Sequence, residues 1–146
     1  EMRLAISNHG VRWMKKALEV ELPSQLIRDY KDVVGAPKGW VWQKQWVVSD
    51  YHPFIVEHGD DFAGPTPHLQ AAQANLYRTA IGHHHTKSGI EYVNGRSGQK
   101  WGMVTGCAID FEAYAFDYAR KHLTKPVLSG GLVFNKGTTP VIIPME

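Results

Sequence analysis

The chain has 146 residues, which suits one domain, and its 43% hydrophobic and 21% charged residues exclude a disordered or low-complexity protein. Sixteen basic against 14 acidic residues give a formal charge of +2, which permits a nucleic-acid partner without implying one. The single cysteine excludes an intrachain disulfide, and no apolar run reaches the roughly 18 residues of a membrane helix. We therefore expect one compact domain over residues 1–146 with no membrane association, in a reducing compartment or secreted without disulfides, whether it is a whole protein or a module of a longer chain.

The first half of the chain carries two helical patterns and then a series of strand formers. Val11, Met14 and Leu18 recur at helical spacing, and Ser24 is a typical N-cap for the helix that follows Pro23. The predicted elements here are helices over 11–21 and 24–35 and strands over 40–48 and 54–58.

The second half opens with a helix that Pro67 starts and Gly82 stops, after a loop over 59–67. The Asn94-Gly95 pair predicts a turn between two strands. The remaining predictions are an extended segment over 83–93, a strand over 100–105, a helix over 110–122 and short strands at 127–128, 132–134 and 141–143. This order is not a regular βαβ repeat, so the predicted fold class is α+β, a mainly antiparallel sheet with about four helices packed on it.

Six of the eight histidines lie between residues 52 and 85, where random placement would put about two. They are His52, His58, His68, His83, His84 and His85. In an extended segment, His83, His85 and Lys87 would share one face, because side chains alternate along a strand. Two imidazoles and an ammonium are the parts of a metal-independent ribonuclease: a base, an acid and a cation for the phosphorane.

The leading hypothesis is therefore a small hydrolase that cleaves phosphodiester bonds in RNA or DNA, of the kind found in toxin-like effector domains. Its predicted catalytic residues are His58, His83, His85 and Lys87. Its predicted substrate-binding residues are Arg78, Arg96 and Lys100. The expected partners are a nucleic-acid substrate and a protein partner or inhibitor. The competing interpretation is that the histidines are separate surface residues with no common site.

A divalent metal ion is the alternative use of the same histidines, since imidazole and carboxylate groups are metal ligands. The predicted ligands are His58, Asp60, His68 and His84. A hairpin followed by a helix is also similar to the ββα-metal nucleases, and this resemblance implies helix ligands at Asp110 and His122, although the usual asparagine is missing.

Cys107 supports a second enzyme hypothesis, because a thiol just before a helix has a lowered pKa and becomes nucleophilic. The pentapeptide 103–107, Met-Val-Thr-Gly-Cys, resembles a short element of the Cys–His glutamine deamidases, with threonine in place of the key serine. This resemblance implies Cys107 as nucleophile, with a histidine of the cluster as base. A third hypothesis is a non-enzymatic binding module that uses the face with Trp40, Trp42 and Trp46, unless these residues belong to the core.

Overall fold

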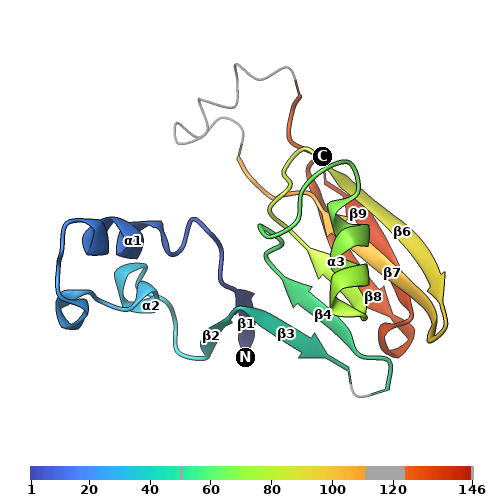
Figure 1. The fold of residues 1–146 in the computed structure, drawn as a ribbon, viewed down its shortest axis with the longest axis horizontal. Coiled ribbons are helices and arrows are strands. Elements are labelled where there is room, and N and C mark those ends of the chain that lie inside the picture. Colours follow the sequence, from blue (N-terminus) through green and yellow to red (C-terminus); the bar gives the residue numbers. More distant parts are fainter. Residues whose placement is uncertain (50, 111–123, 146) are drawn as a thin grey trace.

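The computed structural model describes residues 1–49, 51–110 and 124–145 (Figure 1). The helices are α1 (Arg12–Glu19), α2 (Tyr30–Val33) and α3 (Pro67–Asn75), with single 3₁₀ turns at Ser24–Leu26 and Asn135–Gly137. The strands are β1 (Met2–Ala5), β2 (Trp40–Gln43), β3 (Gln45–Val48), β4 (Phe54–Glu57), β5 (Arg78–Ile81), β6 (Ser88–Gly95), β7 (Gly98–Thr105), β8 (Ser129–Phe134) and β9 (Thr139–Pro144).

The central element is a five-stranded sheet with the order β3-β4-β5-β7-β6. The pairings β4–β5 and β5–β7 are parallel, whereas both outer pairings, β3–β4 and β6–β7, are antiparallel. The three parallel strands therefore end at the same edge of the sheet, and this edge carries the histidines discussed below.

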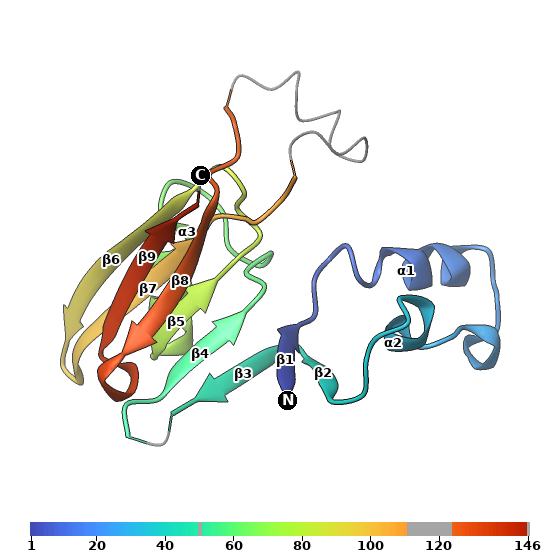
Figure 2. The same ribbon diagram turned by 180° about the vertical axis from the view of Figure 1, so that it is seen from behind.

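The two faces of the sheet are covered by different elements (Figures 1 and 2). On one face α3 packs against β5 and β7, with Ala71, Ile81 and Val104 buried between them. On the other face the antiparallel hairpin β8–β9 covers Trp101 and Met103. The result is a three-layer arrangement of helix, sheet and hairpin around two hydrophobic cores.

The first 43 residues form what we call the N-terminal lobe, with α1, α2 and the parallel pair β1–β2, which lies beside the sheet at its β3 edge (Figure 1). Strand β3 continues directly from β2 into the sheet. The indole Nε1 of Trp46 donates to the Leu4 carbonyl at 2.9 Å, and the Arg3 guanidinium lies 5.1 Å from the centre of the same indole. These contacts join the lobe to the sheet.

The class prediction is confirmed as mixed α and β, and most paired strand residues are antiparallel. Two details differ. The described residues contain three α-helices where about four were predicted, because the fourth prediction falls mainly on residues 111–123, outside the described residues. The predicted second helix is instead a 3₁₀ turn and the single turn α2, since Ile27 and Asp29 have extended ψ angles of 119° and 145°. In the described residues no helix is long and apolar enough to cross a membrane.

The larger correction concerns residues 67–82, which the helical spacing predicted as one helix. Helix α3 ends at Asn75 because Leu76 takes a left-handed conformation with φ 57°, and residues 78–81 then form β5. Thr79 and Ile81 are 0% and 1% exposed in the middle of the sheet, so tertiary burial overrides the local helical pattern.

Gly102 fixes how closely α3 approaches β7, and Gly102→Ala tests this contact. A Cβ at Gly102 would lie 2.1 Å from the carbonyl oxygen of His68, so α3 must move away from the sheet. We expect the free energy of unfolding to fall by about 1–3 kcal/mol, as for overpacking of a core. The control is Gly89→Ala in β6, where a Cβ meets nothing within 4 Å. Urea unfolding measures both; equal effects would contradict the close packing.

Candidate functional site

Parallel strands bring distant histidines to one edge of the sheet. Glu57 of β4 is in register with Ile81 of β5, which is in register with Val104 of β7. His58 directly follows β4, and His83 follows β5 after one glycine. Ligand sites in sheets with parallel strands lie beyond the carboxyl ends of those strands, which is the position of both histidines.

The backbone on both sides of the histidine pair is tightly specified. Gly59 has φ +90°, and a Cβ there would lie 2.7 Å from the Cβ of Ile81, so a glycine is required immediately after His58. His83 has φ 60°, a left-handed conformation that costs a non-glycine residue about 1–2 kcal/mol. Strain of this kind is often found at functional sites, because the surrounding structure must hold the residue there.

His58 is at the centre of a hydrogen-bonded chain of three side chains. Its Nε2 lies 3.0 Å from Nδ1 of His83 and 2.9 Å from Oδ1 of Asn8. The two imidazole rings meet edge to face with their centres 4.9 Å apart. The contact therefore joins the end of β4, the end of β5 and the N-terminal lobe in one site.

The two contacts of His58 Nε2 allow its tautomer to be assigned. An imidazole nitrogen in its neutral form carries either one hydrogen or one lone pair. With the Asn8 oxygen as acceptor, His58 Nε2 carries the hydrogen, and His83 Nδ1 accepts the same hydrogen. This tautomer follows from the hydrogen-bond pattern. In this tautomer His58 has its lone pair on Nδ1, and His83 has its hydrogen on Nε2. The only hydrogen between the two rings is therefore the one on His58 Nε2.

Burial and repulsion from a neighbouring imidazole disfavour the charged forms of His58 and His85. Burial, followed by the nearby His83, lowers the pKa of His58, and Asp60 partly offsets this effect. The same two causes, burial first and His83 second, lower the pKa of His85. An uncharged imidazole is the form that accepts a proton, so the cluster is suited to general base chemistry.

His84 and His85 lie in the turn after His83, not on an extended strand as predicted. The amide of His84 donates to the Gly82 carbonyl at 2.6 Å, and that of Lys87 to the His84 carbonyl at 3.0 Å. The ring of His84 lies edge to face with that of His83, at 5.1 Å between centres. Burial lowers the pKa of His84. The alternation that would have placed His83 and His85 together therefore does not occur, and β6 begins only at Ser88.

The predicted metal ligands are not brought together. His68 lies on α3 with 7% of its side chain exposed, and its Nε2 is 4.0 Å from Glu91 of β6, whereas His58 and Asp60 lie at the end of β4. Burial lowers the pKa of His68. Among the residues that the structure describes, no three histidine, cysteine or acidic side chains are arranged to hold a metal ion.

The lysine and arginine residues that were predicted to act with the histidines lie elsewhere or make other contacts. The Lys87 ammonium donates to the carbonyl oxygens of Gly64 and Pro65, so it holds the loop after β4. Arg96 is in the turn of the β6–β7 hairpin, roughly 23 Å along β6 from the histidine loop at 3.3 Å per residue. Lys100 donates to Ser97 in the same turn, and Arg78 begins β5 at the opposite end from His83. The structure therefore does not gather Arg78, Arg96 and Lys100 around the histidines.

Cys107 follows β7 at the same edge, but its environment differs from that of a reactive thiol. Its Sγ lies 3.9 Å and 3.7 Å from the carbonyl oxygens of His85 and Val127, to which the thiol donates. Burial raises the pKa of the Cys107 thiol, which disfavours the thiolate that a nucleophile needs. The helix predicted over 110–122, including His122, lies almost wholly outside the described residues.

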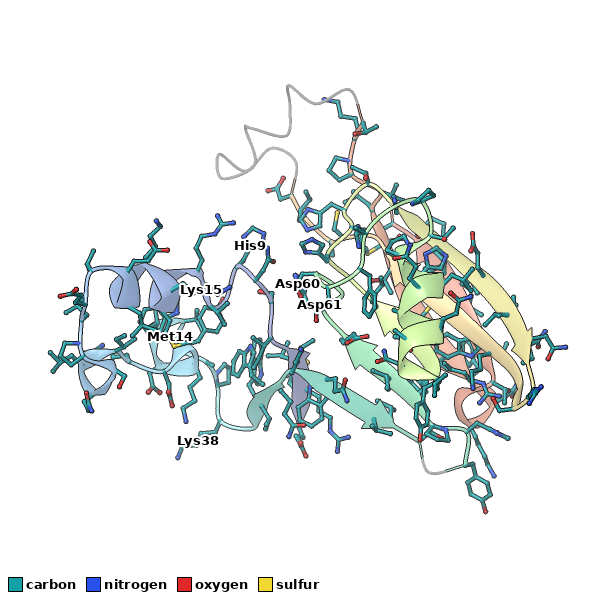
Figure 3. All side chains as sticks on the ribbon, viewed as in Figure 1. His9, Met14, Lys15, Lys38, Asp60 and Asp61 are labelled. Carbon is teal, nitrogen blue, oxygen red and sulfur yellow. The ribbon has the colours of Figure 1, made fainter. Side chains whose placement is uncertain are left out.

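Two residues of the site, Asn8 and His9, are not among those predicted from the sequence. Asn8 bonds His58 across 50 positions of sequence, and His9 contributes to lowering the pKa of both His58 and His85. Figure 3 shows His9 on the N-terminal lobe, with Asp60 and Asp61 on the neighbouring loop after β4. The only signal in the sequence is the polar run Ser-Asn-His-Gly at 7–10, between β1 and α1.

Two hollows accompany the site. A pocket of about 280 Å³ lies between the lobe and the end of β4, and Asn8, His58 and Asp60 are in its wall. A groove of about 1000 Å³ lies within the N-terminal lobe, lined by residues such as Trp13, Tyr30 and Trp42. Comparisons with protein-family models, curated proteins and solved structures find no match.

Because burial lowers the pKa of four histidines, we predict that acid destabilises the fold. In the folded state the pKa values of His58, His68, His84 and His85 lie below the usual 6.5, so the unfolded chain binds more protons as pH falls. The contribution of these histidines to the free energy of unfolding is fully present above pH 6.5, and it is lost as pH falls through their pKa values in the folded state. Urea unfolding at pH 7.5 and pH 5.5 measures this. His68→Gln should reduce the difference, whereas replacing the exposed His52 should not; a flat pH dependence would contradict the burial argument.

Proposed function

We propose that this protein is a small hydrolase that cleaves phosphodiester bonds in RNA, with His58 and His83 as its acid–base pair. The observation that carries the proposal is the 3.0 Å contact between His58 Nε2 and His83 Nδ1 at the carboxyl ends of two parallel strands. A ribose 2′-hydroxyl supplies its own nucleophile, so RNA needs from the protein only a base, an acid and charge stabilisation.

The tautomer gives each ring a role in the first step. His58 Nδ1 takes the proton of the 2′-hydroxyl while the oxygen attacks phosphorus. The hydrogen of His58 Nε2 passes to His83 Nδ1, and His83 Nε2 gives its hydrogen to the departing 5′-oxygen. A 2′,3′-cyclic phosphate forms and the P–O5′ bond breaks. Proton numbers balance, because the pair receives one proton and releases one.

The second step returns the pair to its starting state. A water molecule attacks the cyclic phosphate and gives its proton to His83 Nε2. The hydrogen moves back from His83 Nδ1 to His58 Nε2, and His58 Nδ1 protonates the departing 2′-oxygen. Asn8 favours this return, since its oxygen accepts a hydrogen bond only when His58 Nε2 is protonated. Asn8 is therefore a positioning residue of the reaction.

Cleavage of an RNA oligonucleotide tests the proposal. We expect His58→Ala and His83→Ala each to lower kcat/KM by about 100-fold or more, the typical contribution of a general acid or base. The matched control is His52→Ala, since His52 is exposed, and Cys107→Ala should also keep full activity. Circular dichroism verifies that each variant is folded. Full activity in folded His83→Ala, or no cleavage by the unaltered protein, would overturn the proposal.

The pH profile of kcat/KM tests the role of Asn8. Because burial and His83 lower the pKa of His58, the acid limb should lie below the usual value of 6.5. Asn8→Asp places a carboxylate next to Nε2, which favours the imidazolium and moves the acid limb to higher pH. Asn8→Ala should reduce the rate without that upward shift. Identical acid limbs in the unaltered protein and Asn8→Asp would show that His58 is not the titrating base.

The apolar groove of the N-terminal lobe favours a second candidate function, a binding module. Trp42 lies in its wall, with its ring centre 6.0 Å from those of both Tyr30 and Trp40, so aromatic surface is concentrated there. Loss of partner binding in Trp42→Ala, with all histidine variants behaving as the unaltered protein, would support this function over the hydrolase.

A further inference from the structure

The small pocket on one side of His58 differs in its charged groups from the histidine loop on the other side. Its lining includes Asp60, Asp61 and Lys44, of which Asp61 and Lys44 form an ion pair, together with the aliphatic residues Ile6 and Val11. The other side of His58 faces His83, with His9 and His85 also near enough to lower its pKa. His58 therefore lies between a pocket with the carboxylate of Asp60, which is unpaired among the described residues, and a group of imidazoles that donate and accept hydrogen bonds.

This difference between the two sides of His58 favours one orientation of a bound substrate. A phosphate group is repelled by the carboxylates of the pocket, whereas on the other side of His58 it can accept a hydrogen bond from Nε2–H of His83. The part of the substrate that enters the pocket must be uncharged or positive, and it must be small, because about 280 Å³ lies at the lower limit for ligand pockets. The aliphatic side chains of Ile6 and Val11 suit the flat face of a ring. A single nucleobase meets these requirements.

We infer that this pocket binds the base next to the scissile phosphate and selects guanine, through hydrogen bonds to the carboxylate of Asp60; the inference rests on the proposed function. Guanine presents two adjacent donors on its Watson–Crick edge, N1–H and the N2 amino group, which match the two oxygens of one carboxylate. Adenine and cytosine present one amino donor beside acceptor atoms, and uracil one N–H between two carbonyl groups.

We expect Asp60, rather than Asp61, to accept the hydrogen bonds from the base. The Asp61 carboxylate lies 3.5 Å from the Lys44 ammonium, an exposed ion pair that occupies part of its hydrogen-bonding capacity. Asp60 has no ion pair of this kind among the described residues, and it follows His58 by two positions, with both residues in the lining of the pocket. Both side chains project from the loop after β4 on the side of the N-terminal lobe (Figure 3).

The test measures kcat/KM for two sets of dinucleoside monophosphates, in which the base on one or the other side of the phosphate is varied. In one set we expect the guanine substrate to be cleaved fastest. Asp60→Asn should lower the guanine-to-adenine ratio of kcat/KM by about 5- to 150-fold, the range for a bidentate contact to a base. Using this ratio cancels any effect of Asp60 on the pKa of His58, since that effect is common to all substrates. Asp61→Asn is the matched control and should change the ratio less than about threefold.

A binding measurement separates this inference from the proposed function. Titration of folded His83→Ala with guanosine, followed by NMR, should shift the signals of Ile6, Val11 and Asp60, whereas adenosine should not. Guanosine binding without RNA cleavage by the unaltered protein would support the pocket and overturn the hydrolase. Cleavage with equal rates for all bases, or with an unchanged ratio in Asp60→Asn, would overturn the pocket and leave the hydrolase. Preference for another base would overturn the assignment of guanine.

Discussion

The parallel pairing of β4, β5 and β7 is the constraint on which the candidate site depends. Strands that run in the same direction end at the same edge, so His58, His83 and Cys107 lie along one edge of the sheet although 49 positions separate the first from the last. Burial of Thr79, Ile81 and Val104 holds this pairing in place. The hydrophobic cores on the two faces of the sheet thereby fix the positions of polar side chains at its edge.

Some of this arrangement was predictable from the sequence. The β6–β7 hairpin, helix α1 and the start of α3 at Pro67 follow from short-range patterns, and the histidine-rich stretch contains both residues of the His58–His83 contact. Strand β5 was not predictable by the same means, because its four residues continue the helical spacing of α3 and become a strand only through burial between β4 and β7. The turn at His83–Lys87 was missed for a related reason: the left-handed backbone of His83 is maintained by tertiary contacts.

The location of the proton within the histidine pair depends on a residue outside the sheet. Asn8 Oδ1 accepts the hydrogen assigned to His58 Nε2, and Asn8 belongs to a lobe that also contacts the sheet through Trp46 of β3. His9 and the pocket wall at Ile6 and Val11 come from the same short segment. The sheet thus supplies the two imidazole rings, and the lobe supplies the Asn8 oxygen that contacts His58 and one wall of the pocket beside it.

This distribution of the site over two parts of the chain has a practical consequence. The lobe ends at Gln43, where β2 passes into β3 through Lys44, a single exposed residue. A polypeptide divided there yields one fragment that holds Asn8 and another that holds both imidazoles. Neither piece contains the hydrogen-bonded trio, so the contact between Asn8 and His58 can form only when the two fragments associate. Reassociation of the halves therefore restores a site that neither fragment holds alone.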